Sequence, residues 1–173
     1  DPILFVSSGG SALNPYYAFQ KSIGLEAQYT GDVTLLKWES LHGTQSSLLG
    51  AHDFAAAVAG IEYTFYGPFE TMWDIGLIVE IQHDDRPQAA ANQFGVAGVR
   101  LVFNDIADSN ILFLASADRK ADQSVVSLEA SRRISDVTSV KLTSQFYNAR
   151  TTTSTFGQLS DDDAVTLTLN MFF

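Results

Sequence analysis

Apolar and polar residues alternate along most of this chain, from about residue 19 to the last residue. The segment 164–173 shows the pattern most clearly, because every second residue is apolar and the residues between them, as far as Asn170, are small or polar. Its apolar residues are Val165, Leu167, Leu169, Met171 and Phe173. Successive side chains of a strand point to opposite faces, so this period of two predicts a strand with one apolar and one polar face.

The same pattern predicts about ten strands in the whole chain. Nine of them are strong, and the weak one is 3–8, followed by turn signals at Gly9-Gly10-Ser11 and Asn14-Pro15. The strong strands are expected at 19–30, 33–41, 54–66, 74–83, 94–103, 110–117, 124–134, 138–147 and 164–173. In 110–117 almost every residue is apolar, which leaves its facing open. No long segment keeps the 3.6-residue apolar period of a helix, so an all-β fold is expected.

The connections between these strands alternate in length. Counted back from the C-terminus, the segments 149–163, 84–93 and 42–53 are long and 119–123 is intermediate. The segments 135–136, 104–109, 67–73 and 31–32 are short. In an up-and-down sheet all the short connections then lie at the end that carries Phe173. Short turns at one end and long loops at the other are typical of transmembrane β-barrels.

The C-terminal strand resembles the last strand of bacterial outer-membrane barrels, whose terminal aromatic residue belongs to the signal read by the barrel-insertion machinery. The resemblance implies that Leu169, Met171 and Phe173 form this membrane-insertion signal. The stretch Gly60-Ile61-Glu62-Tyr63-Thr64-Phe65-Tyr66-Gly67, with Asp74-Ile75-Gly76-Leu77 after it, is similar to the C-terminal region of uncharacterised proteobacterial outer-membrane proteins. Those chains are longer, so this chain is either one complete barrel domain over 1–173 or the C-terminal part of a larger barrel. Asp1 is either a mature N-terminus or the start of a fragment.

The predicted fold is therefore an antiparallel up-and-down transmembrane β-barrel in the outer membrane of a Gram-negative bacterium. A soluble barrel or sandwich is the competing fold, because alternation alone does not tell which face is inside. Aromatic residues at the expected strand ends favour the membrane version, since they suit both interfaces. The set near the short turns is Tyr29, Tyr63, Phe65, Tyr66, Phe69, Trp73, Phe103, Phe172 and Phe173. The set near the long loops is Tyr16, Tyr17, Phe19, Phe54, Phe94, Phe146 and Tyr147.

Composition narrows the partners. The net charge is −10 at pH 7, and only 17% of the residues are charged. Phosphate binding needs clustered Lys and Arg, so nucleic acid is not expected as a partner. No run approaches the eighteen or so apolar residues of a transmembrane helix. The expected partners are outer-membrane lipid, lipopolysaccharide and the insertion machinery, with a protein partner or an oligomer left open.

Ionisable residues of both signs recur on the predicted polar faces, where they would line the lumen of a barrel. The candidates are Glu26, Lys37, Glu39, Glu62, Glu80, Arg100, Glu129, Arg133 and Lys141. They either tune a polar pore or fill a closed lumen with side chains and ion pairs. A barrel of eight strands has room for little more than side chains, and a wider barrel leaves a channel.

The three histidines are expected at one rim, at the ends of neighbouring strands. His42 ends one strand, His52 precedes Asp53, and His83 precedes Asp84 and Asp85. Histidine with carboxylates suits a general base or a metal ligand, with Ser40, Ser46 and Ser47 as nearby hydroxyls. A solvated loop explains the same residues, and it also explains Asp161-Asp162-Asp163, although carboxylates suit Ca²⁺ or cation-bridged lipopolysaccharide. No recognised catalytic motif, phosphate loop or metal-spaced Cys/His set is present, so no enzyme activity, no cofactor and no metal are predicted.

The sequence thus predicts an outer-membrane barrel that conducts or helps export small or amphipathic solutes. Two alternatives stay open. One is a structural membrane anchor or assembly component whose loops bind a partner, and the other is a hydrolase with its site at the rim.

Overall fold

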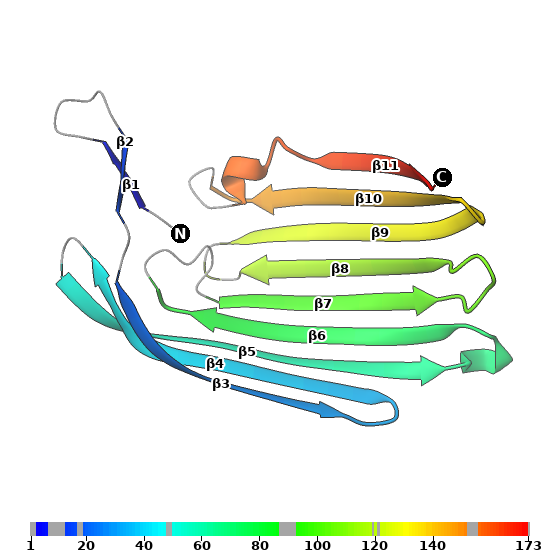
Figure 1. Cartoon of the computed structure of the whole chain (residues 1–173), viewed down its shortest axis with the longest axis horizontal. Helices are drawn as coiled ribbons and strands as arrows, with labels where there is room; N and C mark the ends of the chain where they lie inside the picture. The colour runs from blue at the N-terminus through cyan, green and yellow to red at the C-terminus, as the bar shows by residue number, and fades with distance from the viewer. Residues whose placement is uncertain are drawn as a thin grey trace.

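The protein is all-β and consists mainly of one open antiparallel sheet of nine strands (Figure 1). The computed structural model describes residues 3–6, 13–16, 19–47, 50–86, 93–118, 120, 122–151 and 156–172. The strands of the sheet are β3 (Gln20–Thr30), β4 (Thr34–Ser47), β5 (Gly50–Tyr66), β6 (Asp74–Asp84), β7 (Gln93–Val102), β8 (Asn110–Asp118), β9 (Gln123–Ser135), β10 (Thr138–Ala149) and β11 (Ala164–Met171). They pair strictly in chain order, so the predicted up-and-down topology is confirmed.

The N-terminal strands were predicted less well. The strands β1 (Ile3–Val6) and β2 (Leu13–Tyr16) pair with each other in a separate two-stranded sheet. The expected strand 3–8 is thus half of a hairpin and not a member of the main sheet. The turn expected at Asn14-Pro15 is wrong, because both residues belong to β2 and Pro15 lies opposite Leu4.

In the described part of the chain, the helical content is limited to two short 3-10 turns, η1 (Pro68–Glu70) and η2 (Gly157–Leu159). Among the residues that the structure describes, no helix is long and apolar enough to cross a membrane.

The connections predicted to be short, at 31–32, 67–73, 104–109 and 135–136, lie at one end of the sheet, and the longest connection, between β10 and β11, lies at the other. The connections β3–β4, β5–β6, β7–β8 and β9–β10 share one end with the C-terminus, and we call it the turn end (Figure 1). The opposite end is the loop end. The expected long loop 42–53 is wrong, because β4 and β5 stay paired up to Ser47 and Gly50. The apolar alternation stops near residue 41, but backbone pairing continues without it.

One face of the sheet is predominantly apolar on every strand, and we call it the apolar face. A single row of directly paired residues illustrates it from β3 to β10: Tyr29, Leu36, Ile61, Val79, Ala97, Ala115, Val126 and Phe146. Asp, Glu, Lys, Arg and His enter this face among the described residues only near its two borders. They are Lys21, His42, Asp53 and His83 at the loop end and Arg132 at the turn end. The apolar face is therefore a belt that crosses every strand.

The opposite face, called the polar face here, carries the remaining charged residues of the strands. It also holds some apolar residues, and β8 shows why its facing was open from sequence. Leu112 and Leu114 lie on the polar face opposite Arg100 and Gly98, while Ile111 and Phe113 lie on the apolar face.

The apolar face is the more exposed one and the polar face the more buried one, which is the reverse of a sheet in a soluble protein. In β6, Leu77, Val79 and Ile81 on the apolar face are 44%, 49% and 63% exposed, whereas Ile78 and Glu80 on the polar face are half-buried. Phe54, on the polar face, is the one apolar side chain found buried in the described residues. Sheets of soluble proteins bury their apolar side, whereas this sheet exposes it.

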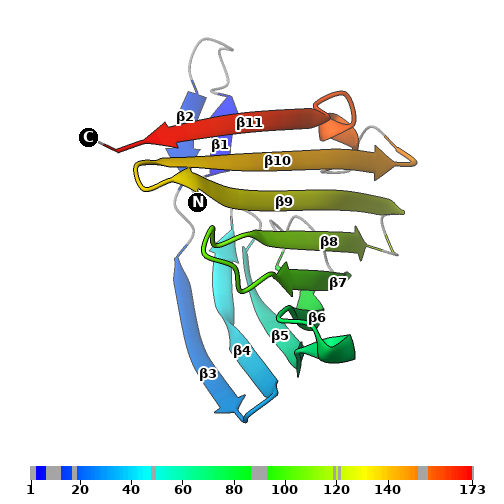
Figure 2. The ribbon, with the colours of Figure 1, turned by 90° about the vertical axis from the view of Figure 1, so that its right-hand side faces the viewer.

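The sheet curves and twists strongly between its two edges (Figure 2). The rings of Phe94 on β7 and Tyr147 on β10 lie 5.8 and 6.0 Å from the ring of Phe156. These strands are three strand spacings apart, or about 14 Å on a flat sheet. One ring bridges them because side chains converge on the inner side of a curved sheet, so the polar face is the concave one. The edge strands β3 and β11 each have a single neighbour, and the sheet is open.

Candidate functional site on the polar face

All nine candidate lumen residues lie on the concave polar face. The register places Glu26 opposite Glu39 and Arg100 opposite Gly76. Lys141 lies opposite Ser131, so Glu129 is its diagonal neighbour on the same face. Their alternation along each strand is enough to bring them to one face, because the strands pair without slipping a residue except at one bulge between Thr138 and Ser139.

Two ion pairs join candidate residues across strands. The Arg100 Nη1 lies 2.8 Å from the Glu62 Oε1, and the Lys141 Nζ lies 2.9 Å from the Glu129 Oε1. The pair of Glu62 and Arg100 reaches over β6, and Gly76 of β6 leaves room for it. A Cβ at Gly76 would lie 3.2 Å from the Glu62 Oε1. Mixed charges on this face thus partly neutralise one another.

Glu26 and Glu39 carry like charges and face each other directly. Neither carboxylate has a hydrogen bond or ion pair within the described part of the chain. They line a hollow of about 580 Å³ together with Leu41, Gln82, Asp84 and Arg86. Like charges directly opposite one another destabilise a sheet, which marks this corner as electrostatically unsatisfied.

Arg133 lies on the polar face at the turn end of the sheet, where its charge is paired. Its guanidinium pairs with Asp108 in the β7–β8 turn, and its backbone N–H donates to the Ala107 carbonyl at 2.7 Å. In the same turn, the backbone N–H and hydroxyl of Ser109 donate to Asp105 at 2.8 Å each. These bonds, with a smaller contribution from Arg132, hold the pKa of Asp105 below its ordinary value.

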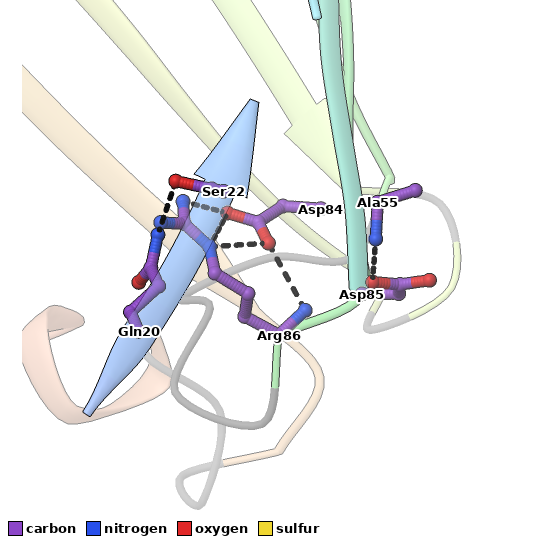
Figure 3. A network of polar contacts seen from close by, with 6 residues as sticks. All are labelled: Gln20, Ser22, Ala55, Asp84, Asp85 and Arg86. Atoms are coloured by element: carbon purple, nitrogen blue, oxygen red, sulfur yellow. Dashed lines mark hydrogen bonds and ion pairs between the residues drawn. The ribbon is translucent and has the colours of Figure 1, made fainter. Parts of the chain in front are cut away.

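A cluster of Phe54, Asp84 and Arg86 lies at the loop end, and we call it the Arg86 cluster; Figure 3 shows its pair of Asp84 and Arg86. Arg86 donates to Asp84 from its backbone N–H at 3.0 Å and from Nε at 2.9 Å, and its guanidinium lies 5.7 Å from the Phe54 ring centroid. The hydrogen bond to Asp84 raises the pKa of Arg86 above its ordinary value. Asp85, which lies between Asp84 and Arg86 in the chain, accepts a hydrogen bond from the backbone N–H of Ala55 at 2.6 Å. This bond ties the loop to β5.

A second cluster at the loop end, the Phe156 cluster, consists of Phe94, Tyr147 and Phe156. The backbone N–H of Phe156 donates to the Gln123 Oε1 at 3.0 Å, and Gln123 is buried. The backbone N–H of Tyr147 donates to Asp163 at 2.8 Å. The end of the β10–β11 loop is thereby folded onto the polar face.

The expected belt of aromatic residues near the long loops is therefore wrong for three of its members. Phe54, Phe94 and Tyr147 lie on the polar face, where they pack inside the loop-end clusters. Phe19 and Phe146 lie on the apolar face and are exposed. Tyr16 lies in β2, where side chains are not described, and Tyr17 lies outside the described residues. Sequence reasoning missed Phe156 because it is a lone aromatic residue in a loop rich in Thr and Ser.

The three histidines do not converge. The register places His42 and His83 on the apolar face and His52 on the polar face, opposite Gln45. The Ser46 hydroxyl is occupied by the backbone of Phe19, at 2.7 Å from its N–H and 3.1 Å from its carbonyl. Among the described residues, no three His, Cys, Asp or Glu side chains are grouped to hold a metal ion.

The expected insertion signal is described only in part. Leu169 and Met171 lie on the apolar face of β11 and are exposed, whereas Phe173 lies outside the described residues.

Comparison with known proteins assigns no family to this chain. No protein-family model, no curated protein and no solved structure matches the chain.

Proposed function

We propose that this protein is a β-barrel of the bacterial outer membrane through which small solutes pass. The observation that carries the proposal is the pairing of two unlike faces in one curved sheet. The convex face exposes large apolar side chains across every strand, and the concave face holds the ion pairs. Lipid suits the first face and a hydrated lumen suits the second, because ionised groups in a bilayer stay where they are paired or hydrated.

An exposed apolar surface as extensive as the convex face is unfavourable in water. A soluble monomer rarely exposes an apolar patch larger than a few hundred Å². Here Leu77, Val79 and Ile81 of one strand are each at least 44% exposed, and the equivalent positions of the neighbouring strands continue the same surface. Contact with lipid removes this apolar area from water at about 25 cal/mol per Å².

The location can be tested by fractionation and by gel mobility. We expect the protein in the outer-membrane fraction, and we expect it to migrate faster on a gel when unheated than when boiled. A protein that stays in the aqueous phase without detergent contradicts the proposal.

Conduction is tested separately in planar lipid bilayers. Stepwise openings that require the inserted protein support passage of solutes. A specific observation favours the alternative of a closed membrane anchor: the ion pairs of Glu62 with Arg100 and of Lys141 with Glu129 occupy the concave face. Complete insertion without openings at any voltage would therefore replace the channel by the anchor.

A further inference from the structure

Two turns at the turn end carry the most exposed large apolar side chains in the described part of the chain. Phe69 in the β5–β6 turn is 94% exposed, and Ile106 in the β7–β8 turn is 98% exposed. Neither residue lies in a strand, so neither belongs to the apolar face that crosses the strands. Contact of that face with lipid therefore does not account for them.

The backbone around Phe69 is strained and yet closed by hydrogen bonds. Phe69 and Glu70 have φ values of 56° and 60°, a left-handed conformation that costs a residue with a side chain about 1–2 kcal/mol. Thr71 closes the turn, because its hydroxyl and its backbone N–H both donate to the Pro68 carbonyl, at 2.7 and 3.2 Å. The fold thus holds an aromatic side chain in water at a cost, which is typical of a segment preorganised for a partner.

The β7–β8 turn is fixed on both sides of Ile106. Before it in the chain, Asp105 accepts hydrogen bonds from the N–H and the hydroxyl of Ser109, both at 2.8 Å. After it, the Asp108 carboxylate pairs with the guanidinium of Arg133 on β9. Little conformational freedom is left for this turn to lose on binding, which favours association.

Side-chain contacts join the two turns into one surface. The Asn104 Nδ2 donates to the Met72 carbonyl at 2.8 Å, and the rings of Trp73 and Phe103 lie 5.2 Å apart. Met72 is itself 75% exposed. We call the exposed apolar residues of these joined turns the turn-end surface: Phe69, Met72 and Ile106.

Acidic residues lie beside the exposed apolar residues in three turns of this end. The chain neighbours are Phe69 with Glu70, Asp105 with Ile106, and Asp136 with Val137. Within the described residues, Glu70 and Asp136 have no ion pair and no side-chain hydrogen bond. Arg132 and Arg133 already face carboxylates of the β7–β8 turn. Apolar and basic side chains therefore complement this end, whereas an anionic lipid surface does not.

We propose that the turn-end surface binds a basic amphipathic segment of a protein partner. The apolar side chains of the segment pack on Phe69 and Ile106, and its cations lie toward Glu70. Apolar anchors with complementary charge around them are typical of binding hot spots. The surface goes beyond the proposed function, and only the location of the partner in the periplasm rests on it, because the short turns of outer-membrane barrels face that side.

Binding of two synthetic helices tests the proposal. The full polypeptide is placed in phosphatidylcholine nanodiscs, and the probe is a fluorescent amphipathic helix of leucine and lysine. A helix of leucine and glutamate is its counterpart, and empty nanodiscs are the blank. We expect only the lysine helix to bind, and we expect its Kd to rise about tenfold in Phe69→Ser and in Ile106→Ser. Equal binding of both helices, or unchanged affinity in either variant, overturns the proposal.

Glu70→Gln separates the charge from the apolar contact. We expect it to weaken binding of the lysine helix and to reduce the salt dependence of that binding. Asp161→Asn is the matched control, because it removes the same charge from an exposed residue of the β10–β11 loop, and it should bind like the unchanged protein. An equal loss in the control would show that the helix responds to net charge alone, which also overturns the proposal.

A single label distinguishes a protein partner from lipid, because the sequence contains no cysteine. An environment-sensitive dye on Ile106→Cys should report water before the lysine helix is added and apolar surroundings afterwards. Quenching by nitroxide-labelled lipid in the absence of the helix would place the turn in the bilayer and overturn the proposal. Failure of the proposed function has a different signature, since recovery of the protein in the aqueous fraction contradicts the membrane location whether or not the helix binds.

Discussion

The Glu62 carboxylate on β5 and the Arg100 guanidinium on β7 meet at 2.8 Å across the intervening strand β6. The contact is possible because Gly76 lies between them and has no side chain. Glu62 is the more buried partner, with 20% of its side chain exposed, against 46% for Arg100. Partly exposed ion pairs contribute about 0.2–1 kcal/mol.

Substitution at Gly76 should therefore disturb this ion pair. In Gly76→Val the added atoms occupy the space of the Glu62 carboxylate and separate it from Arg100, so we expect a loss of stability of about 1 kcal/mol. This loss of stability is measured as a fall in the temperature above which the protein no longer migrates in its faster, unheated form on a gel. Gly95→Val is the matched control, because a Cβ there meets nothing within 4 Å. Equal effects at both positions would contradict a role for the ion pair.

A charge on the apolar face should block membrane assembly, whereas a charge on the polar face should not. Val79→Lys places an ammonium on the convex belt at mid-strand, which costs about 2–4 kcal/mol near the bilayer midplane. Ile78→Lys, one residue away, points to the polar face beside Glu62. We expect the first variant to be lost from the outer-membrane fraction and the second to assemble. Assembly of both variants would show that the convex face does not meet lipid.

Relieving the like-charge pair on β3 and β4 should stabilise the sheet. Glu39→Lys places a cation opposite Glu26, and cross-strand pairs of opposite charge contribute about 0.2–1 kcal/mol. Gln28→Lys creates the reverse situation, because Gln28 lies opposite Lys37. We expect the unfolding temperature to rise in the first variant and fall in the second. A fall in both would mean that the two glutamates are not a source of strain.

Removal of the Phe156 ring should release the end of the β10–β11 loop. Phe156→Ala deletes both ring contacts, to Phe94 and to Tyr147, and we expect a loss of about 1–2 kcal/mol, below the 3–5 typical of fully buried rings. Limited proteolysis should then cleave near residues 150–160. Phe146→Ala is the control, because its exposed ring lies on the apolar face, and it should leave the cleavage pattern unchanged.

Acid should loosen the β7–β8 turn through Asp105. The pKa of this carboxyl is held below its ordinary value, chiefly by hydrogen bonds from Ser109. Its contribution to stability is then fully present above the ordinary pKa and is lost as the pH falls through the lowered one. We expect the Ser109 amide resonance to shift in that acidic window in the native protein. In Asp105→Asn the shift should be absent, and a shift that persists would assign the titration to another group.

The sequence by itself determined the nine strands, their order and the faces of most of their side chains, with the strand 110–117 left open. A period of two is a local property of an extended chain, and it survives wherever one face must be apolar, so strands such as 74–83 and 164–173 were located to within two residues. The same reasoning failed at 42–53 and at the N-terminal hairpin, where backbone pairing does not depend on alternating side chains.

Only the tertiary structure decided which face is concave and which charges meet. Arg100 reaches Glu62 over a glycine of a third strand, Phe156 bridges β7 and β10, and His52 is turned away from His42 and His83. These relationships depend on the curvature of the sheet and on the register of strands far apart in sequence, and no local pattern of residues encodes either.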